Sequence, residues 1–120
     1  MTVVCPREGL TREEPVFAGC QRFNGNGEMT GLEWIRESGA LTTPVAITNT
    51  HSVGVVRDAL VAAEFEERTE EYWVLPVVAE TYDGTLNDIN GQHVTPDHLR
   101  EALARAAGRS RRAPSAGGRA

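Results

Sequence analysis

The stretch that decides the fold is Trp73-Val-Leu-Pro-Val-Val-Ala79, which runs directly into Glu80-Thr-Tyr-Asp-Gly84. Its near-continuous apolar character is typical of a strand covered on both faces. Pro76 donates no hydrogen bond to a neighbouring strand, so the sequence predicts an edge position or a bulge there. Glu80 and Tyr82 lie two residues apart where this strand gives way to a turn. We therefore expect both side chains to point the same way out of the strand end.

Three further segments predict helices. The clearest covers residues 96–107, with Thr95 as its cap and Gly108 as its stop. Apolar side chains at three- and four-residue spacing predict another helix over residues 53–65, capped by Ser52. A short helix begins near residue 32, where Thr30 and Glu33 match a capping box, and Gly39 can close it.

Three other segments predict strands, at residues 3–5, 15–23 and 44–48. Strands that alternate with helices indicate an α/β fold, with a mixed sheet and flanking helices. In such folds ligands tend to bind at strand ends.

Length and composition fit one folded domain. The chain has 120 residues, of which 40% are hydrophobic and 24% charged, and this excludes a disordered or fibrous protein. The sequence contains neither an apolar run of about 20 residues nor the basic and apolar regions of a signal peptide. We expect a cytoplasmic protein without a membrane partner.

Charge separates the chain into two parts. Residues 1–104 hold seven arginines and all 17 acidic residues, whereas residues 105–120 hold five arginines and no acid. The acidic body excludes nucleic acid as a partner, and the absence of lysine excludes Schiff-base chemistry. Residues 1–107 are predicted to form the α/β domain, and residues 108–120 a disordered basic tail. The tail also has the composition expected of a GC-rich gene read out of frame, and that alternative stays open.

The segment from Asn24 to Gly31 reads Asn-Gly-Asn-Gly-Glu-Met-Thr-Gly and predicts a shaped loop. The spacing of Gly25, Gly27 and Gly31 is one residue longer than the dinucleotide fingerprint, so phosphate binding is the less favoured hypothesis. The histidines His51, His93 and His98 lack the spacing of a metal site, and we expect no metal or organic cofactor. Cys5 and Cys20 are expected to be reduced packing residues, which makes a nucleophilic pair of Cys20 with His51 a minor alternative.

The pair of Glu80 and Tyr82 suits a polar pocket. A carboxylate can hold a substrate ammonium, and a phenol can donate a hydrogen bond to a developing oxyanion. The spacing of these residues does not exclude an alternative, in which Glu80 and Asp83 are turn residues and Tyr82 is a packing residue.

Several blocks resemble the L-aminopeptidase/D-esterase family, which includes D-aminopeptidases and β-aminopeptidases. They are residues 24–31, Thr48-Asn-Thr-His-Ser-Val-Gly-Val-Val-Arg-Asp58, and residues 75–84 with Leu86-Asn-Asp-Ile-Asn-Gly91. The resemblance implies the αββα layering of N-terminal-nucleophile hydrolases. It also implies a precursor that cleaves itself, so that a serine at the new amino terminus attacks short peptides, amino acid amides or esters.

The same resemblance suggests roles for individual residues. Glu80 corresponds to the acid that holds the substrate ammonium, and Tyr82 to a catalytic residue beside the oxyanion. Pocket-shaping roles fall on the glycine loop and on the turn after the third predicted strand, namely Asn24, Gly25, Asn26, Gly27, Asn49 and His51.

The chain also departs from the family pattern. It begins inside the pattern and ends before the nucleophilic serine, and neither Ser110 nor Ser115 lies in a matching motif. We therefore expect a larger-subunit fragment that is inactive alone and needs a downstream half or subunit, complete family members being oligomeric. A noncatalytic binding or interaction module is the alternative, ahead of a nucleotide-binding module.

Overall fold

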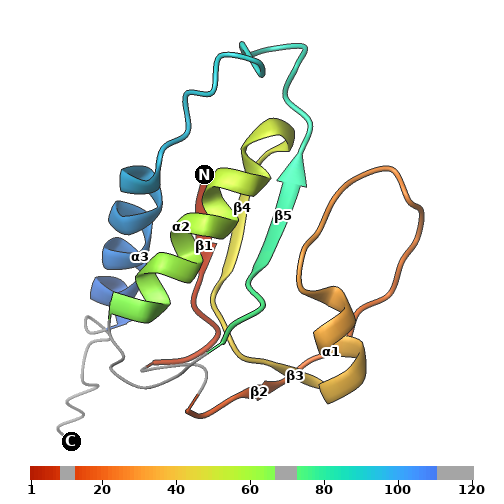
Figure 1. Ribbon diagram of the computed structural model, residues 1–120, viewed down its shortest axis with the longest axis vertical. Coiled ribbons are helices and arrows are strands. Elements are labelled where there is room, and N and C mark those ends of the chain that lie inside the picture. Colours follow the sequence, from red (N-terminus) through yellow and green to blue (C-terminus); the bar gives the residue numbers. More distant parts are fainter. Residues whose placement is uncertain (9–12, 67–72, 111–120) are drawn as a thin grey trace, which may run out of the picture.

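The computed structural model describes residues 1–8, 13–66 and 73–110 (Figure 1). The predicted tail therefore lies largely outside the described residues. Five strands are described, together with three α-helices and one 3₁₀ turn. In chain order these are β1 (Thr2–Val4), β2 (Val16–Phe17), α1 (Leu32–Ser38), β3 (Ala40–Leu41), β4 (Val45–Asn49), the 3₁₀ turn η1 (Thr50–Ser52), α2 (Val53–Glu66), β5 (Val77–Thr81) and α3 (Pro96–Ser110).

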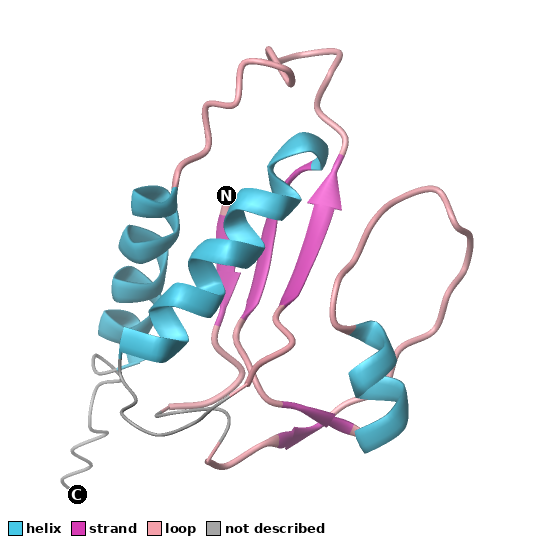
Figure 2. Cartoon of the chain, viewed as in Figure 1, coloured by secondary structure: helices cyan, strands magenta, loops and turns pink. Residues whose placement is uncertain are grey.

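The larger sheet has the strand order β1-β4-β5. β4 runs antiparallel to β1, with Ala46 opposite Val3, and parallel to β5, with Thr48 opposite Glu80. The sheet is therefore mixed, as the sequence predicts. Helices α2 and α3 lie side by side over one face of it (Figure 2). The core between these layers contains Ala46, Val53, Val56, Ala59, Leu60, Val78 and Leu99.

A smaller unit packs against the other face of β5. It consists of α1 and the two-stranded sheet of β2 and β3. Val77 joins Ile35 and Leu41 in its core, whereas the next residue, Val78, joins the core under α2 and α3. Successive side chains of a strand point to opposite faces, so burial of both valines confirms the prediction of a strand covered on both sides.

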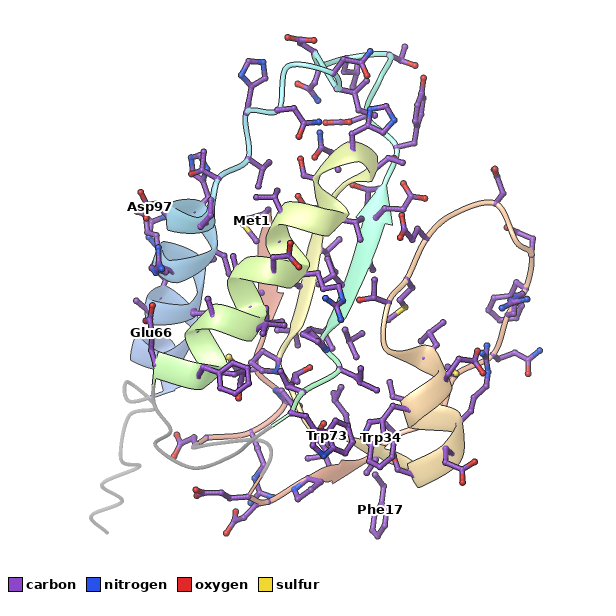
Figure 3. The ribbon with its side chains drawn as sticks, viewed as in Figure 1. Met1, Phe17, Trp34, Glu66, Trp73 and Asp97 are labelled. Carbon is purple, nitrogen blue, oxygen red and sulfur yellow. The ribbon has the colours of Figure 1, made fainter. Side chains whose placement is uncertain are left out.

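An aromatic pair connects α1 to the segment before β5. The rings of Trp34 and Trp73 meet edge to face, with centroids 5.0 Å apart and planes at 82° (Figure 3). This arrangement suits the charge distribution of aromatic rings, whose edges are positive and faces negative. Phe17 lies near them but points into solvent, fully exposed.

The outer edge of β5 is occupied by the end of the glycine loop. Met29 forms an antiparallel bridge with Ala79. The Thr30 amide donates to the Val78 carbonyl at 2.9 Å, and the Glu80 amide donates to the Glu28 carbonyl at 3.1 Å. The loop is therefore attached to the sheet by backbone hydrogen bonds.

The side chain of Thr30 adds two more bonds at this edge. Its hydroxyl donates to the Pro76 carbonyl at 2.7 Å and accepts from the Val78 amide at 3.0 Å. The predicted capping box of Thr30 with Glu33 is therefore wrong. Gly31 caps α1 instead, in a left-handed conformation and without a side-chain hydrogen bond.

Other predicted boundaries also change. Over residues 15–23 only Val16–Phe17 forms a strand, because β3 offers just two residues as a partner. β5 begins after Pro76 instead of containing it, and it is an edge strand of its sheet as predicted. Ser52 is buried in η1, which runs directly into α2, and α3 continues past Gly108 to Ser110.

Replacing Thr30 by valine keeps the shape of the side chain and removes its hydroxyl. We expect the free energy of unfolding to fall by about 2 kcal/mol, because the Val78 amide and the Pro76 carbonyl then lose a partner in a partly buried place. Urea denaturation followed by circular dichroism measures this. Thr30→Ser, which keeps the hydroxyl, is the matched control, and an equal loss in both variants would contradict the role of the two hydrogen bonds.

Candidate functional site

A cleft of about 640 Å³ opens between the glycine loop, α1 and the end of β5. It combines acidic, basic, amide and apolar side chains within one hollow. Its lining includes Asn24, Gly25, Asn26, Gly27, Glu28, Met29, Leu32, Ala79 and Glu80, together with Cys20, Arg22 and Arg36.

Glu80 is the acid at the strand end of this cleft. Its side chain is half-buried, and the Thr50 hydroxyl donates a hydrogen bond to its Oε2 atom. The parallel register explains this contact, because Thr48 lies beside Glu80 and the chain then continues from β4 into η1. The carboxylate is therefore positioned by two neighbouring strand ends.

The glycine loop approaches the same carboxylate from the other side. A Cβ atom at Gly27 would lie 2.6 Å from Oε1 of Glu80, so only glycine allows the observed approach without a shift of that side chain. Nearby, the side chain of Asn24 accepts a hydrogen bond from the amide of Asn26 at 2.9 Å, which shapes the loop. Of the predicted site residues, the structure thus brings together Glu80 and the segment from Asn24 to Gly27.

Tyr82 does not line this cleft. Its side chain is 72% exposed, and its hydroxyl lies against Gly84, where a Cβ atom would be only 2.6 Å away. β5 ends at Thr81, so the alternation of a strand no longer governs the direction of Tyr82. The expectation that Glu80 and Tyr82 project together from the strand is not met in the described cleft.

Asn49 and His51 also lie outside the lining of the cleft, although they flank Thr50. The Oδ1 atom of Asn49 is buried and has no hydrogen-bond partner among the described residues. His51 is exposed, and its Nδ1 atom lies 2.9 Å from Oδ1 of Asn90 in the segment between β5 and α3. Both residues are therefore placed around the strand ends without contacting the cleft.

Sequence reasoning missed Thr50, Arg22 and Arg36 as residues of the site. Thr50 lies two residues after the predicted third strand, between the predicted site residues Asn49 and His51, and this position near a strand end was the available signal. The arginines carried no such signal, because neither belongs to a motif that defines a ligand.

The structure does not bring together the residues of the alternative metal site or of the alternative Cys20–His51 pair. Within residues 1–8, 13–66 and 73–110, no group of three histidine, cysteine or acidic residues could hold a metal ion. His93 pairs with Asp88 at 3.0 Å, and His98 accepts a hydrogen bond from the Thr95 amide at 3.0 Å. Both cysteines are free, and burial raises the pKa of the Cys5 thiol. Cys20 lines the cleft and His51 does not, so they form no pair there.

No helix in the described part of the chain is both long enough and apolar enough to cross a bilayer.

Solved structures share this fold. A β-aminopeptidase from Burkholderia sp. superposes with a TM-score of 0.82 at 62% identity, covering 85% of this chain and 29% of its own. An L-aminopeptidase D-Ala-esterase/amidase from Ochrobactrum anthropi superposes with a TM-score of 0.68 at 51% identity, covering 75% of this chain and 26% of its own. The latter is a prototype for the serine aminopeptidases and a variant of the N-terminal-nucleophile (Ntn) hydrolase fold. The mixed sheet and its helices therefore define an α/β protein with the fold of the Ntn-hydrolase aminopeptidases.

The particular family follows from the sequence. Residues 1–119 match Peptidase family S58, and the chain belongs to that family. The β-peptidyl aminopeptidase BapA of Sphingosinicella microcystinivorans is 52% identical over 107 residues, which are 89% of this chain and 27% of that protein. The chain thus spans about a quarter of the length of the curated relatives it matches.

Proposed function

We propose that this chain forms the substrate-binding part of an aminopeptidase that removes N-terminal residues from short peptides, amino acid amides or esters. The observation that carries the proposal is the half-buried carboxylate of Glu80 in the cleft, held by Thr50 and approached by Gly27. A carboxylate fixed in this way can bind the free ammonium that distinguishes the amino terminus of a peptide. The relatives named above are aminopeptidases, which supports this assignment.

The attacking alcohol is proposed to come from a second polypeptide segment. Two serines fall within the described side chains, and neither lines the cleft. Ser38 binds the Trp34 carbonyl at 2.7 Å in α1, and Ser52 is buried in η1. A nucleophile needs a base and an oxyanion donor at fixed positions, so we place it in the part of the family pattern that the chain does not span. A cytoplasmic location and an oligomeric assembly belong to the same proposal.

Tyr82 and Asn49 take roles at the border of the cleft in this proposal. Tyr82 would donate to the oxyanion once a second segment covers its exposed ring. The Oδ1 atom of Asn49, which is buried and has no partner among the described residues, is an acceptor for a donor group brought by that segment. His51, bonded to Asn90, would hold the neighbouring loop in place.

The ammonium role is tested by binding. Isothermal titration calorimetry of the purified chain is expected to show alanine amide binding about tenfold more tightly than N-acetylalanine amide, since a charge-assisted hydrogen bond is at stake. Glu80→Gln should abolish that preference. Glu28→Gln, which removes a charge from the same cleft, should keep it. Equal affinity of the two ligands for the unaltered chain would refute the ammonium role.

A further inference from the structure

The arginines of the cleft have no part in the proposed ammonium site. Arg22 and Arg36 line the cleft that contains Glu80, and both also line an adjoining hollow of about 280 Å³. Arg57 lines that hollow too, so three of the seven arginines in residues 1–104 gather in one place. The same part of the sequence carries 17 acidic residues, and among those that the structure describes only Glu33 lines the hollow. The hollow is therefore a positive spot on an acidic protein.

The guanidinium of Arg22 is available to a ligand. Arg36 pairs with Glu33, and Arg57 lies 3.5 Å from Asp58. No ion pair joins Arg22 to any other residue of the described ranges, and its side chain is exposed. A guanidinium presents five N–H donors in a planar fork that matches a carboxylate. Arg22 can therefore bind a carboxylate without first breaking an ion pair.

The adjoining hollow extends to a part of the chain that is separated from Glu80 along β5. The hollow is lined by Leu75 and Pro76, whereas Glu80 lies four residues beyond Pro76 along an extended segment. At about 3.3 Å per residue this separation is about 13 Å along the strand. An extended peptide also advances about 3.3 Å per residue, and the long side chain of Arg22 reduces the distance that the peptide must span. A peptide of about three residues spans about 10 Å, which is most of the separation between Glu80 and the Pro76 part of the hollow.

The cleft and the adjoining hollow also share two apolar side chains. Met29 and Leu32 line both hollows, and Leu32 lies one helical turn before Arg36 on the same face of α1. These side chains can contact the middle of a bound peptide, whose two charged ends then meet groups of opposite sign.

We propose that Arg22, with Arg36 beside it, binds the C-terminal carboxylate of a short peptide whose ammonium is held by Glu80. This inference rests on the proposed function and narrows its substrate class. The preferred ligands are peptides of about three residues with both termini free, rather than long chains or peptide amides.

The test compares three ligands of one length, namely trialanine, trialanine amide and N-acetyltrialanine. Calorimetric titration of the purified chain is expected to give trialanine an affinity about tenfold higher than that of its amide, since one charge-assisted hydrogen bond pair is lost. Arg22→Ala should remove this preference, and Arg22→Lys, which keeps the charge but not the fork, should retain part of it. Arg100→Ala is the control, because Arg100 pairs with Glu66 and Asp97 and lines neither hollow.

The outcomes separate the two proposals. Equal binding of trialanine and its amide to the unaltered chain, or a preference that survives in Arg22→Ala, overturns the carboxylate site. Equal binding of trialanine and N-acetyltrialanine overturns the ammonium site of the proposed function instead. Circular dichroism confirms that each variant is folded, which is expected because Arg22 is exposed.

Discussion

Joined to the remaining segment of a family S58 relative, the chain is expected to hydrolyse alanine p-nitroanilide, whereas the chain alone is expected to release no product. The physical reason is that no serine among the described side chains lines the cleft around Glu80. Removing the nucleophile of a serine hydrolase costs on the order of 10⁶-fold in rate. Absorbance of released nitroaniline measures the difference.

The control for this reconstitution is the same joined protein with the nucleophilic serine of the added segment replaced by alanine. It should fold and remain inactive. Turnover by the isolated chain, at a rate that scales with its concentration, would contradict the proposal that a second segment supplies the attacking alcohol.

Gly31→Ala is expected to lower the free energy of unfolding by about 3 kcal/mol. Gly31 has φ of +76°, where an alanine costs about 1–2 kcal/mol. A Cβ atom there would also lie 2.8 Å from the Pro76 carbonyl oxygen and 3.0 Å from that of Leu75. These are backbone atoms of the segment entering β5, so relief requires a shift that adds a further cost of about 1–3 kcal/mol. Urea denaturation measures the change.

Gly39→Ala is the matched control for this variant. Gly39 ends the same helix with φ of +66°, but a Cβ atom there would meet nothing within 4 Å. Its loss should be confined to the conformational cost of about 1–2 kcal/mol. Identical losses at the two glycines would show that contact with the Pro76 and Leu75 carbonyls contributes nothing.

The elements with a strong local pattern could be predicted from the sequence. The apolar run before Glu80 predicted a strand buried on both sides, as observed. Helices α2 and α3 begin where apolar side chains begin to recur at three- and four-residue spacing. Comparison with solved relatives confirms the α/β fold and the family. These features depend on residues close together in the chain, so a one-dimensional pattern contains them.

Features that depend on distant partners could not be predicted in this way. Thr30 has the local signature of a helix cap, but its hydroxyl finds better partners 46 and 48 residues away, at Pro76 and Val78. The segment from Pro15 to Phe23 has strand-forming residues but only a two-residue partner in β3. Long-range geometry overrides local preference in both cases.

The candidate site, like the fold, could be predicted from the sequence only in part. Glu80 and the Asn24 to Gly27 loop were each predicted as site residues, and the structure shows that they face one cleft. Their contact depends on the close approach of Gly27 to the carboxylate, which no spacing in the sequence reveals. Tyr82 lies outside that cleft because β5 ends one residue before it. Its proposed role therefore depends on what covers the strand end.

The hydrogen bonds along the outer side of β5 also determine how this sheet can grow. The carbonyls of Pro76 and Val78 and the amides of Val78 and Glu80 are already bound by residues 28–30. An added strand would find no vacant groups among these. Within the described sheet the opposite margin belongs to β1, which pairs with β4 alone. An added strand would therefore pair with β1, away from the cleft. This holds for a partner in assembly and for another copy in aggregation.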